Sequence, residues 1–336
     1  MFPQAVQQDK RSKQRIAAII LGIVCLIAAL IFGVVQGSVK FSVSEIYQSI
    51  LAPLDSESYR IIYHLRIPRV ITAALVGSNL ALAGCILQGV LRNPLADPGI
   101  IGVSSGAGLA AMLIMILLPE YTGLIPIAAF VGALVATCVV FALSWERGIN
   151  PLRLILAGVA IAAFFGGGMS ALMVFFSDRV QGTVNWMAGG FQGRSWEHVK
   201  MILPYSAVGI VGVLASYRYL NALQLGDEVA KGLGVKVERA RIILIILAAL
   251  LAASAVSVAG LLGFVGLIIP HIMRLIVGSD FEYLLPTSMF FGAVLVVVAD
   301  TVARTVFSPI EIPVGIFMAF LGAPFFLYLL KRKMHR

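Results

Sequence analysis

The sequence predicts an all-α protein of one domain, residues 1–336, that crosses a membrane about ten times. Hydrophobic residues make up 60% of the chain and charged residues only 12%, whereas soluble domains carry about 25% charged residues. The apolar residues form runs close to the roughly 20 residues that a helix needs to cross a bilayer. These runs lack the alternation of barrel strands, and helices satisfy their own backbone hydrogen bonds in lipid.

Ten apolar segments are candidate spans. The first, 16–35, is longer than the roughly 7–15 apolar residues of a signal peptide, so we expect it to be retained. The eighth, 264–277, is short and contains Pro270. The ten expected spans are 16–35, 70–91, 100–118, 124–144, 152–176, 201–217, 241–262, 264–277, 287–307 and 313–330.

Two local patterns inside this array predict its packing. Gly77 and Gly84 lie in the second span and 166–168 is a run of three glycines in the fifth. Small residues let helix backbones approach closely in lipid, so we expect tight packing at both places. The segment 92–98 contains two prolines, and each proline disfavours helix at the residue before it. It is therefore expected to be a rigid turn.

The basic residues predict the orientation of the chain. An even number of spans places both termini on one side, and both termini are rich in Lys and Arg. Basic segments next to spans favour the cytoplasm, so we expect both termini, and the segment 218–240, to be cytoplasmic. Membrane topology thus explains the net charge of +9, and no nucleic-acid partner is expected.

Catalytic, cofactor and metal motifs are missing from the sequence. It contains no GxxxxGK[ST] phosphate loop and no HExxH, and Cys25, Cys85 and Cys138 lie singly in apolar runs. We therefore expect no enzyme activity, no ATPase site, no cofactor and no bound metal. A transport protein of this kind would draw its energy from another subunit.

Two other function classes stay open at this point. An ion-coupled secondary transporter would use an ionisable group within a span, for which Asp300 is the best candidate. Asp300 precedes Arg304 by four residues, so we interpret the two as a local ion pair on one helix face. A membrane-embedded structural subunit without transport activity is the other alternative.

The polar segment 218–240 is a candidate docking element. The residues 221–231 are expected to form a short helix, which Gly232 and Gly234 would end. Such a helix at the cytoplasmic face suits a soluble partner, and an ordinary solvated loop is the alternative.

Eight motifs in succession carry a family resemblance. They are LRIPR at 65–69, GCILQGVLRNPLADPGIIGVSSGAG at 84–108, LILAGVAI at 154–161, WMAGGFQGRSW at 186–196, LGDEVAKGLGV at 225–235, GLLGFVGLIIPHIMRL at 260–275, ADTVAR at 299–304 and EIPVGIFMAFLGAPFF at 311–326. In this order they resemble the FecCD family of type II ABC importer permeases, which carry iron–siderophores, haem and cobalamin.

The resemblance implies a function and a set of partners. It implies a type II ABC importer permease in a bacterial cell membrane, plasma or inner, that takes up iron(III)–siderophore complexes, with haem and cobalamin as alternatives. It also implies a second permease subunit, identical or paralogous, two ATPase subunits, an extracytoplasmic binding protein and surrounding lipid.

The resemblance further implies three groups of site residues. Those that couple to the ATPase match Leu225, Gly226, Asp227, Glu228 and Gly234. Those that dock the binding protein match the external arginines Arg66, Arg69 and Arg304. Those that narrow the cytoplasmic gate match Asn150, Pro151 and Leu152.

Overall fold

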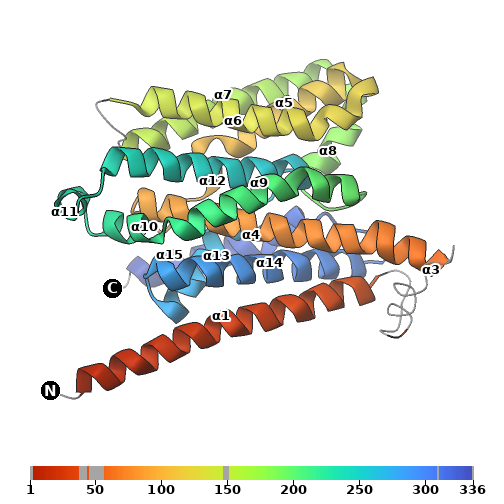
Figure 1. Ribbon diagram of the computed structural model, residues 1–336. Coiled ribbons are helices and arrows are strands. Elements are labelled where there is room, and N and C mark those ends of the chain that lie inside the picture. The colour runs from red at the N-terminus through yellow and green to blue at the C-terminus, as the bar shows by residue number, and fades with distance from the viewer. Residues whose placement is uncertain (1–2, 38–43, 45–56, 147–150, 309, 335–336) are drawn as a thin grey trace.

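The computed structural model describes residues 3–37, 44, 57–146, 151–308 and 310–334. Its helices run side by side across the molecule (Figure 1). Both termini lie at the end where α10 (Tyr217–Gln224) and α11 (Asp227–Gly232) lie, and α3 (Glu57–Tyr59) and α8 (Gln181–Met187) lie at the other end. The chain is therefore all-α and multi-pass, as the sequence predicts.

Seven helical stretches are long and apolar enough to cross a membrane. They contain α1 (Pro3–Val35), α4 (Ile67–Val90), α6 (Ile125–Ser144), α7 (Pro151–Phe175), α9 (Trp196–Ala215), α12 (Val237–Ala259) and α14 (Phe281–Thr305). Two shorter apolar helices are α5 (Val103–Leu117) and α13 (Val265–Val277), and a short apolar stretch, Val314–Leu327, lies within α15 (Val314–Met334). Each of the ten expected segments overlaps one of these helices.

Short elements complete the chain between the long helices. The π-helix η1 (Arg60–Arg66) continues from α3 into α4. The 3-10 turns are η2 (Pro98–Ile101), η3 (Pro119–Leu124) and η4 (Ser177–Arg179). The expected rigid turn precedes η2, where Asn93 Oδ1 accepts from the Leu95 amide at 3.0 Å and Asp97 Oδ1 accepts from the Gly99 amide at 2.9 Å. These side chains stabilise the turn by replacing backbone hydrogen bonds.

The centre of the molecule is α4, which packs against α9, α12, α13 and α14. Glycines set the spacing of these contacts. A Cβ on Gly84 would lie 2.0 Å from the carbonyl oxygen of Gly266, and one on Gly77 would lie 2.2 Å from that of Gly292. The predicted tight packing is therefore confirmed for Gly77 and Gly84.

The helix α7 lies at the periphery, with only 11% of its most apolar stretch buried. No atom lies within 4 Å of where a Cβ on Gly166 or Gly167 would be. The prediction of tight packing at these two residues is wrong within this subunit, because their face of α7 has no neighbour among the described residues. Of the three glycines at 166–168, only Gly168 packs closely, against Leu109.

The prediction of one helix over 221–231 is also wrong. The segment consists of two helices, because α10 ends at Gln224 and α11 begins at Asp227. Gly226 between them has φ +108° and ψ 155°, a conformation that glycine adopts readily and that interrupts the helical path.

Candidate coupling and entry sites

The α10–α11 segment is fastened to the helix bundle through Asp227. Its Oδ1 accepts a hydrogen bond from Arg241 Nη2 at 2.7 Å and also pairs with Arg92 Nη2. Arg92 in turn donates from Nε to the Leu223 carbonyl at 2.9 Å. Because Arg241 belongs to α12 and Arg92 follows α4, one carboxylate joins α11 to the two central helices of the molecule.

A second set of hydrogen bonds fastens α10 to α14. Asn221 donates from Nδ2 to Asp280 Oδ1 at 2.8 Å, and its Oδ1 accepts from the Phe281 amide at 2.9 Å. Asp280 is also the N-cap of α14, where it accepts from the Glu282 amide. The sequence analysis did not identify Asn221 as a site residue, and its only signal was its place within 218–240.

Three exposed apolar side chains lie in α11 or directly beside it. Leu225, Val229 and Leu233 are 62%, 49% and 63% exposed, and we call these three residues the coupling patch. They lie four residues apart along the chain. The sequence analysis identified Leu225 but missed Val229 and Leu233, although this spacing was a signal that could have found them.

The other predicted coupling residues have different surroundings. Gly226 and Gly234 have φ +108° and +81° with open space around them, so the backbone conformation favours glycine there. Glu228 is exposed and pairs with Lys231 at 3.0 Å. The coupling role of these residues stays a prediction.

The predicted gate residues lie where α7 begins. Pro151 is the first residue of α7, and Leu152 after it is exposed. Arg153 pairs with Glu146, which follows α6. Asn150 lies outside the described residues. The gating role of all three predicted residues stays a prediction.

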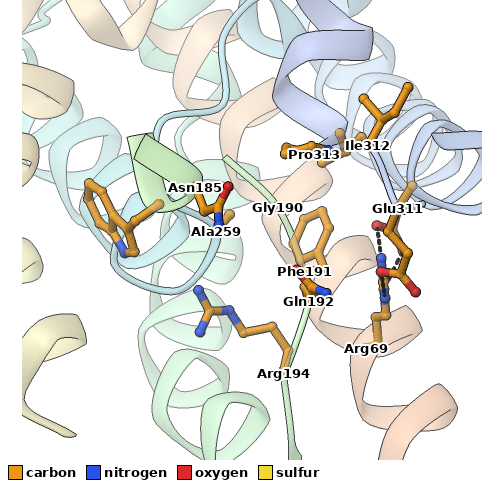
Figure 2. Close-up of a pocket in the computed structure, with 13 residues that line it drawn as sticks. Arg69, Asn185, Gly190, Phe191, Gln192, Arg194, Ala259, Glu311, Ile312 and Pro313 are labelled. Carbon is orange, nitrogen blue, oxygen red and sulfur yellow. Dashed lines mark hydrogen bonds and ion pairs between the residues drawn. The ribbon is translucent and has the colours of Figure 1, made fainter. Parts of the chain in front are cut away.

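At the opposite end of the molecule Arg69 holds two carboxylates (Figure 2). Its Nε and Nη2 donate to the two oxygens of Asp300 at 2.9 Å each, and its Nη1 donates to Glu311 Oε2 at 2.9 Å. The expected pair of Asp300 with Arg304 is looser, at 4.0 Å from Arg304 Nε to Asp300 Oδ2. The predicted ion pair is therefore present, but the bidentate contact from Arg69 of α4 is the main one for Asp300.

The other two predicted docking arginines fasten the end of α1. Arg66 Nη1 donates to the carbonyls of Val34 and Val35 at 2.8 and 3.0 Å, and Arg304 Nη2 donates to the carbonyl of Gly33. Carbonyls in the last turn of a helix lack partners within it, so the arginines satisfy them. Arg66 and Arg304 are only 5% and 7% exposed. Their docking role stays a prediction.

Three cavities of about 180, 280 and 330 Å³ lie at this end of the molecule. Arg194, in the segment between α8 and α9, lines all three. Arg69 and Arg194 lie on opposite sides of the smallest cavity, with Gln192 between them (Figure 2). The sequence analysis quoted the motif around Arg194 but assigned this residue no role.

Comparison with known proteins gives consistent matches over most of the chain. The FecCD transport family matches residues 25–332. The Fe(3+)-citrate import system permease protein YfmE of Bacillus subtilis is 40% identical over 96% of this chain and 97% of its own length. The cobalamin import system permease protein BtuC of Halobacterium salinarum is 44% identical over 80% of this chain and 72% of its own.

A solved structure of an inward-facing metal-chelate type ABC transporter has a TM-score of 0.84 to this chain. Its sequence is 31% identical, and the match covers 94% of this chain and 98% of that one. The likeness therefore extends to the arrangement of nearly all the helices.

Proposed function

The chain belongs to the FecCD transport family, and on this premise we propose that it is the permease subunit of an ABC importer for iron(III)–siderophore complexes. A separate ATPase would power it and an extracytoplasmic binding protein would supply the substrate. The similarity to an Fe(3+)-citrate permease supports an iron chelate as cargo. The similarity to a cobalamin permease keeps cobalamin as the alternative cargo, beside haem.

The observation that carries this proposal is the coupling patch. Leu225, Val229 and Leu233 expose apolar side chains within α11 and directly beside it. An exposed apolar patch outside the lipid favours a protein partner. The termini lie at the same end (Figure 1) and are basic, which supports a cytoplasmic location for the patch. A cytoplasmic ATPase would dock there.

The hydrogen bonds of the segment support a mechanism of alternating access. A push on α11 reaches α12 through the pair of Asp227 and Arg241, and reaches the end of α4 through Arg92. A push on α10 reaches the start of α14 through Asn221. Because α12 and α14 both pack against α4, the movement of one segment would displace the central helices together.

The exposed face of α7 supports a second permease subunit. Gly166 and Gly167 leave open space beside an apolar helix. Small residues allow close approach of another helix in lipid, where apolar surface alone gives little drive for association. The path for the substrate would then lie between two such subunits.

A pair of serine substitutions tests the proposed function. Leu225→Ser with Leu233→Ser should remove most of the ATPase that co-purifies with the permease and lower ATP-dependent iron uptake at least tenfold. Such a loss corresponds to about 1.4 kcal/mol or more of binding free energy. The control is Leu118→Ser, which changes an exposed leucine between α5 and η3 and should leave both quantities unchanged.

Two outcomes would contradict the proposal. One is normal ATPase co-purification and normal uptake in the double variant. The other is uptake that survives loss of ATP but stops with an uncoupler, which would indicate a secondary transporter. Uptake of labelled iron chelates, haem and cobalamin by the same proteoliposomes separates the candidate cargoes.

A further inference from the structure

Among the described residues, the three cavities around Arg194 are lined by four arginines and three carboxylates. The largest of the three cavities, about 330 Å³, is lined by Arg66, Arg69, Arg194 and Arg304, and by one carboxylate, that of Glu311. Asp300 lines the smallest cavity and is held by Arg69, and Glu197 lines the cavity of about 280 Å³. A cavity wall with an excess of one charge attracts ligands of the opposite charge. The largest cavity therefore favours an anion.

The four arginines differ in what they already bind. Arg69 donates to two carboxylates, and Arg66 and Arg304 donate to carbonyls of α1. Among the described residues Arg194 makes no ion pair; its Nη1 contacts His198 Nε2 at 3.2 Å, and its buried Nε has no hydrogen-bond partner. Burial lowers the pKa of Arg194 from its ordinary value, yet arginine remains charged at neutral pH.

The contact with His198 does not neutralise this charge. Because a guanidinium only donates hydrogen bonds, the contact requires His198 Nε2 to accept, and an imidazole that accepts there carries no counter-charge. The other ring nitrogen, Nδ1, lies 3.3 Å from the Ser195 amide nitrogen and 3.2 Å from Ser195 Oγ. Arg194 thus keeps its full charge beside the cavities, while a buried charge without a counter-charge is costly. A carboxylate is the group that best satisfies a guanidinium, since it accepts two parallel hydrogen bonds.

We propose that Arg194 is the centre of an entry site for a carboxylate group of an anionic iron chelate. This inference rests on the proposed function and names the chemical class of its cargo. Gln192, which is exposed and lines the same two cavities as Arg69, would supply an amide for the same ligand. The cavities are at or below the lower end of the roughly 300–1,000 Å³ typical of small-molecule sites. They fit a carboxylate-bearing arm of a chelate rather than a whole bulky one.

Citrate, a tricarboxylate, is the probe for this site. We expect the purified full chain in lipid nanodiscs to bind citrate in a calorimetric titration at fixed ionic strength. Arg194→Gln should weaken the affinity at least about tenfold, as expected for loss of hydrogen bonds to a charged group. The matched control is Arg179→Gln, because Arg179 is half-exposed, pairs with Asp178 and does not line these cavities.

A second substitution keeps the test independent of any folding defect at Arg194. Gln192→Glu places a carboxylate at an exposed position beside Arg194, where it would occupy the guanidinium and repel citrate. It should also weaken citrate binding at least about tenfold. Gln181→Glu adds the same charge at the exposed start of α8, outside the cavities, and should have little effect.

The proposal fails if the unmodified chain does not bind citrate, or if Arg194→Gln and Gln192→Glu bind it as the controls do. It also fails if Arg194→Gln instead weakens only the association with the binding protein, because the carboxylate would then belong to that protein. These failures are distinct from failure of the proposed function, since the complex would still import a neutral iron chelate with ATP.

Discussion

Loss of the Arg69 side chain should destabilise the protein through Asp300. Arg69 forms three hydrogen bonds of 2.9 Å with two carboxylates, and the Asp300 side chain is only 3% exposed whereas that of Glu311 is 35% exposed. In the variant Arg69→Met the nearest remaining cation of Asp300 would be Arg304, at 4.0 Å. Breaking a buried ion pair from one side costs about 3–5 kcal/mol.

The contribution of Glu311 should be much smaller. An exposed ion pair contributes about 0–1 kcal/mol, so Glu311→Gln is expected to lower the free energy of unfolding by about 1 kcal/mol or less. Asp300→Asn in the Arg69→Met background removes the uncompensated charge. The double variant should therefore be more stable than Arg69→Met alone. If the two substitutions acted independently, their costs would add and the double variant would be the less stable of the two.

Equilibrium unfolding in mixed micelles measures all four proteins, the unmodified chain and the three variants. A loss below about 1 kcal/mol for Arg69→Met would refute the account of Asp300 as a buried, dependent charge. A double variant that is less stable than Arg69→Met would refute it as well.

Three further predictions concern packing and coupling. Gly84→Ala should lower the free energy of unfolding by about 1–3 kcal/mol, because its Cβ would meet the Gly266 carbonyl oxygen at 2.0 Å. Gly167→Ala should change the stability of the isolated subunit by less than about 0.5 kcal/mol. Equal effects of the two substitutions in the same unfolding assay would contradict this prediction. Asp227→Ala should reduce ATP-dependent uptake at least about tenfold, because it releases α11 from Arg92 and Arg241. Glu228→Ala removes only an exposed ion pair and should reduce uptake less than about twofold. Normal uptake by the Asp227→Ala variant would contradict the proposed transmission of movement from α11 to α12 and α4. Asn221→Ala should uncouple ATP hydrolysis from uptake in proteoliposomes by loosening α10 from α14, and unchanged uptake per ATP hydrolysed would contradict this role.

The sequence predicted the helical architecture because hydrophobic length alone identifies helices in lipid. It also predicted the close helix contacts at Gly77 and Gly84, because glycine has no Cβ and lets two helix backbones approach closely. The same reasoning failed at Gly166 and Gly167, because composition does not tell whether the facing surface belongs to the same subunit.

The candidate sites were predictable only in part. The positions of Arg66, Arg69 and Arg304 came from a family resemblance, but their partners depend on how α1, α4 and α14 pack, which a linear pattern does not contain. Asp300 illustrates this limit: Arg304 is its neighbour along the helix, yet Arg69, 231 residues away in sequence, binds both of its oxygens. The break at Gly226 was hidden because the flanking residues all tolerate a helix, and one glycine decides the path of the backbone.

The central claim is that the coupling patch and the Arg194 site lie on opposite sides of the membrane. Labelling of single cysteines at the two sites tests this claim most directly. Cysteine is introduced separately at Leu233 in the coupling patch and at Gln192 beside Arg194, after Cys25, Cys85 and Cys138 are replaced by serine or alanine. In intact cells a membrane-impermeant maleimide should label Gln192→Cys, and it should label Leu233→Cys only after the cells are permeabilised. Labelling of Leu233→Cys in intact cells, or of Gln192→Cys only after permeabilisation, would contradict the account.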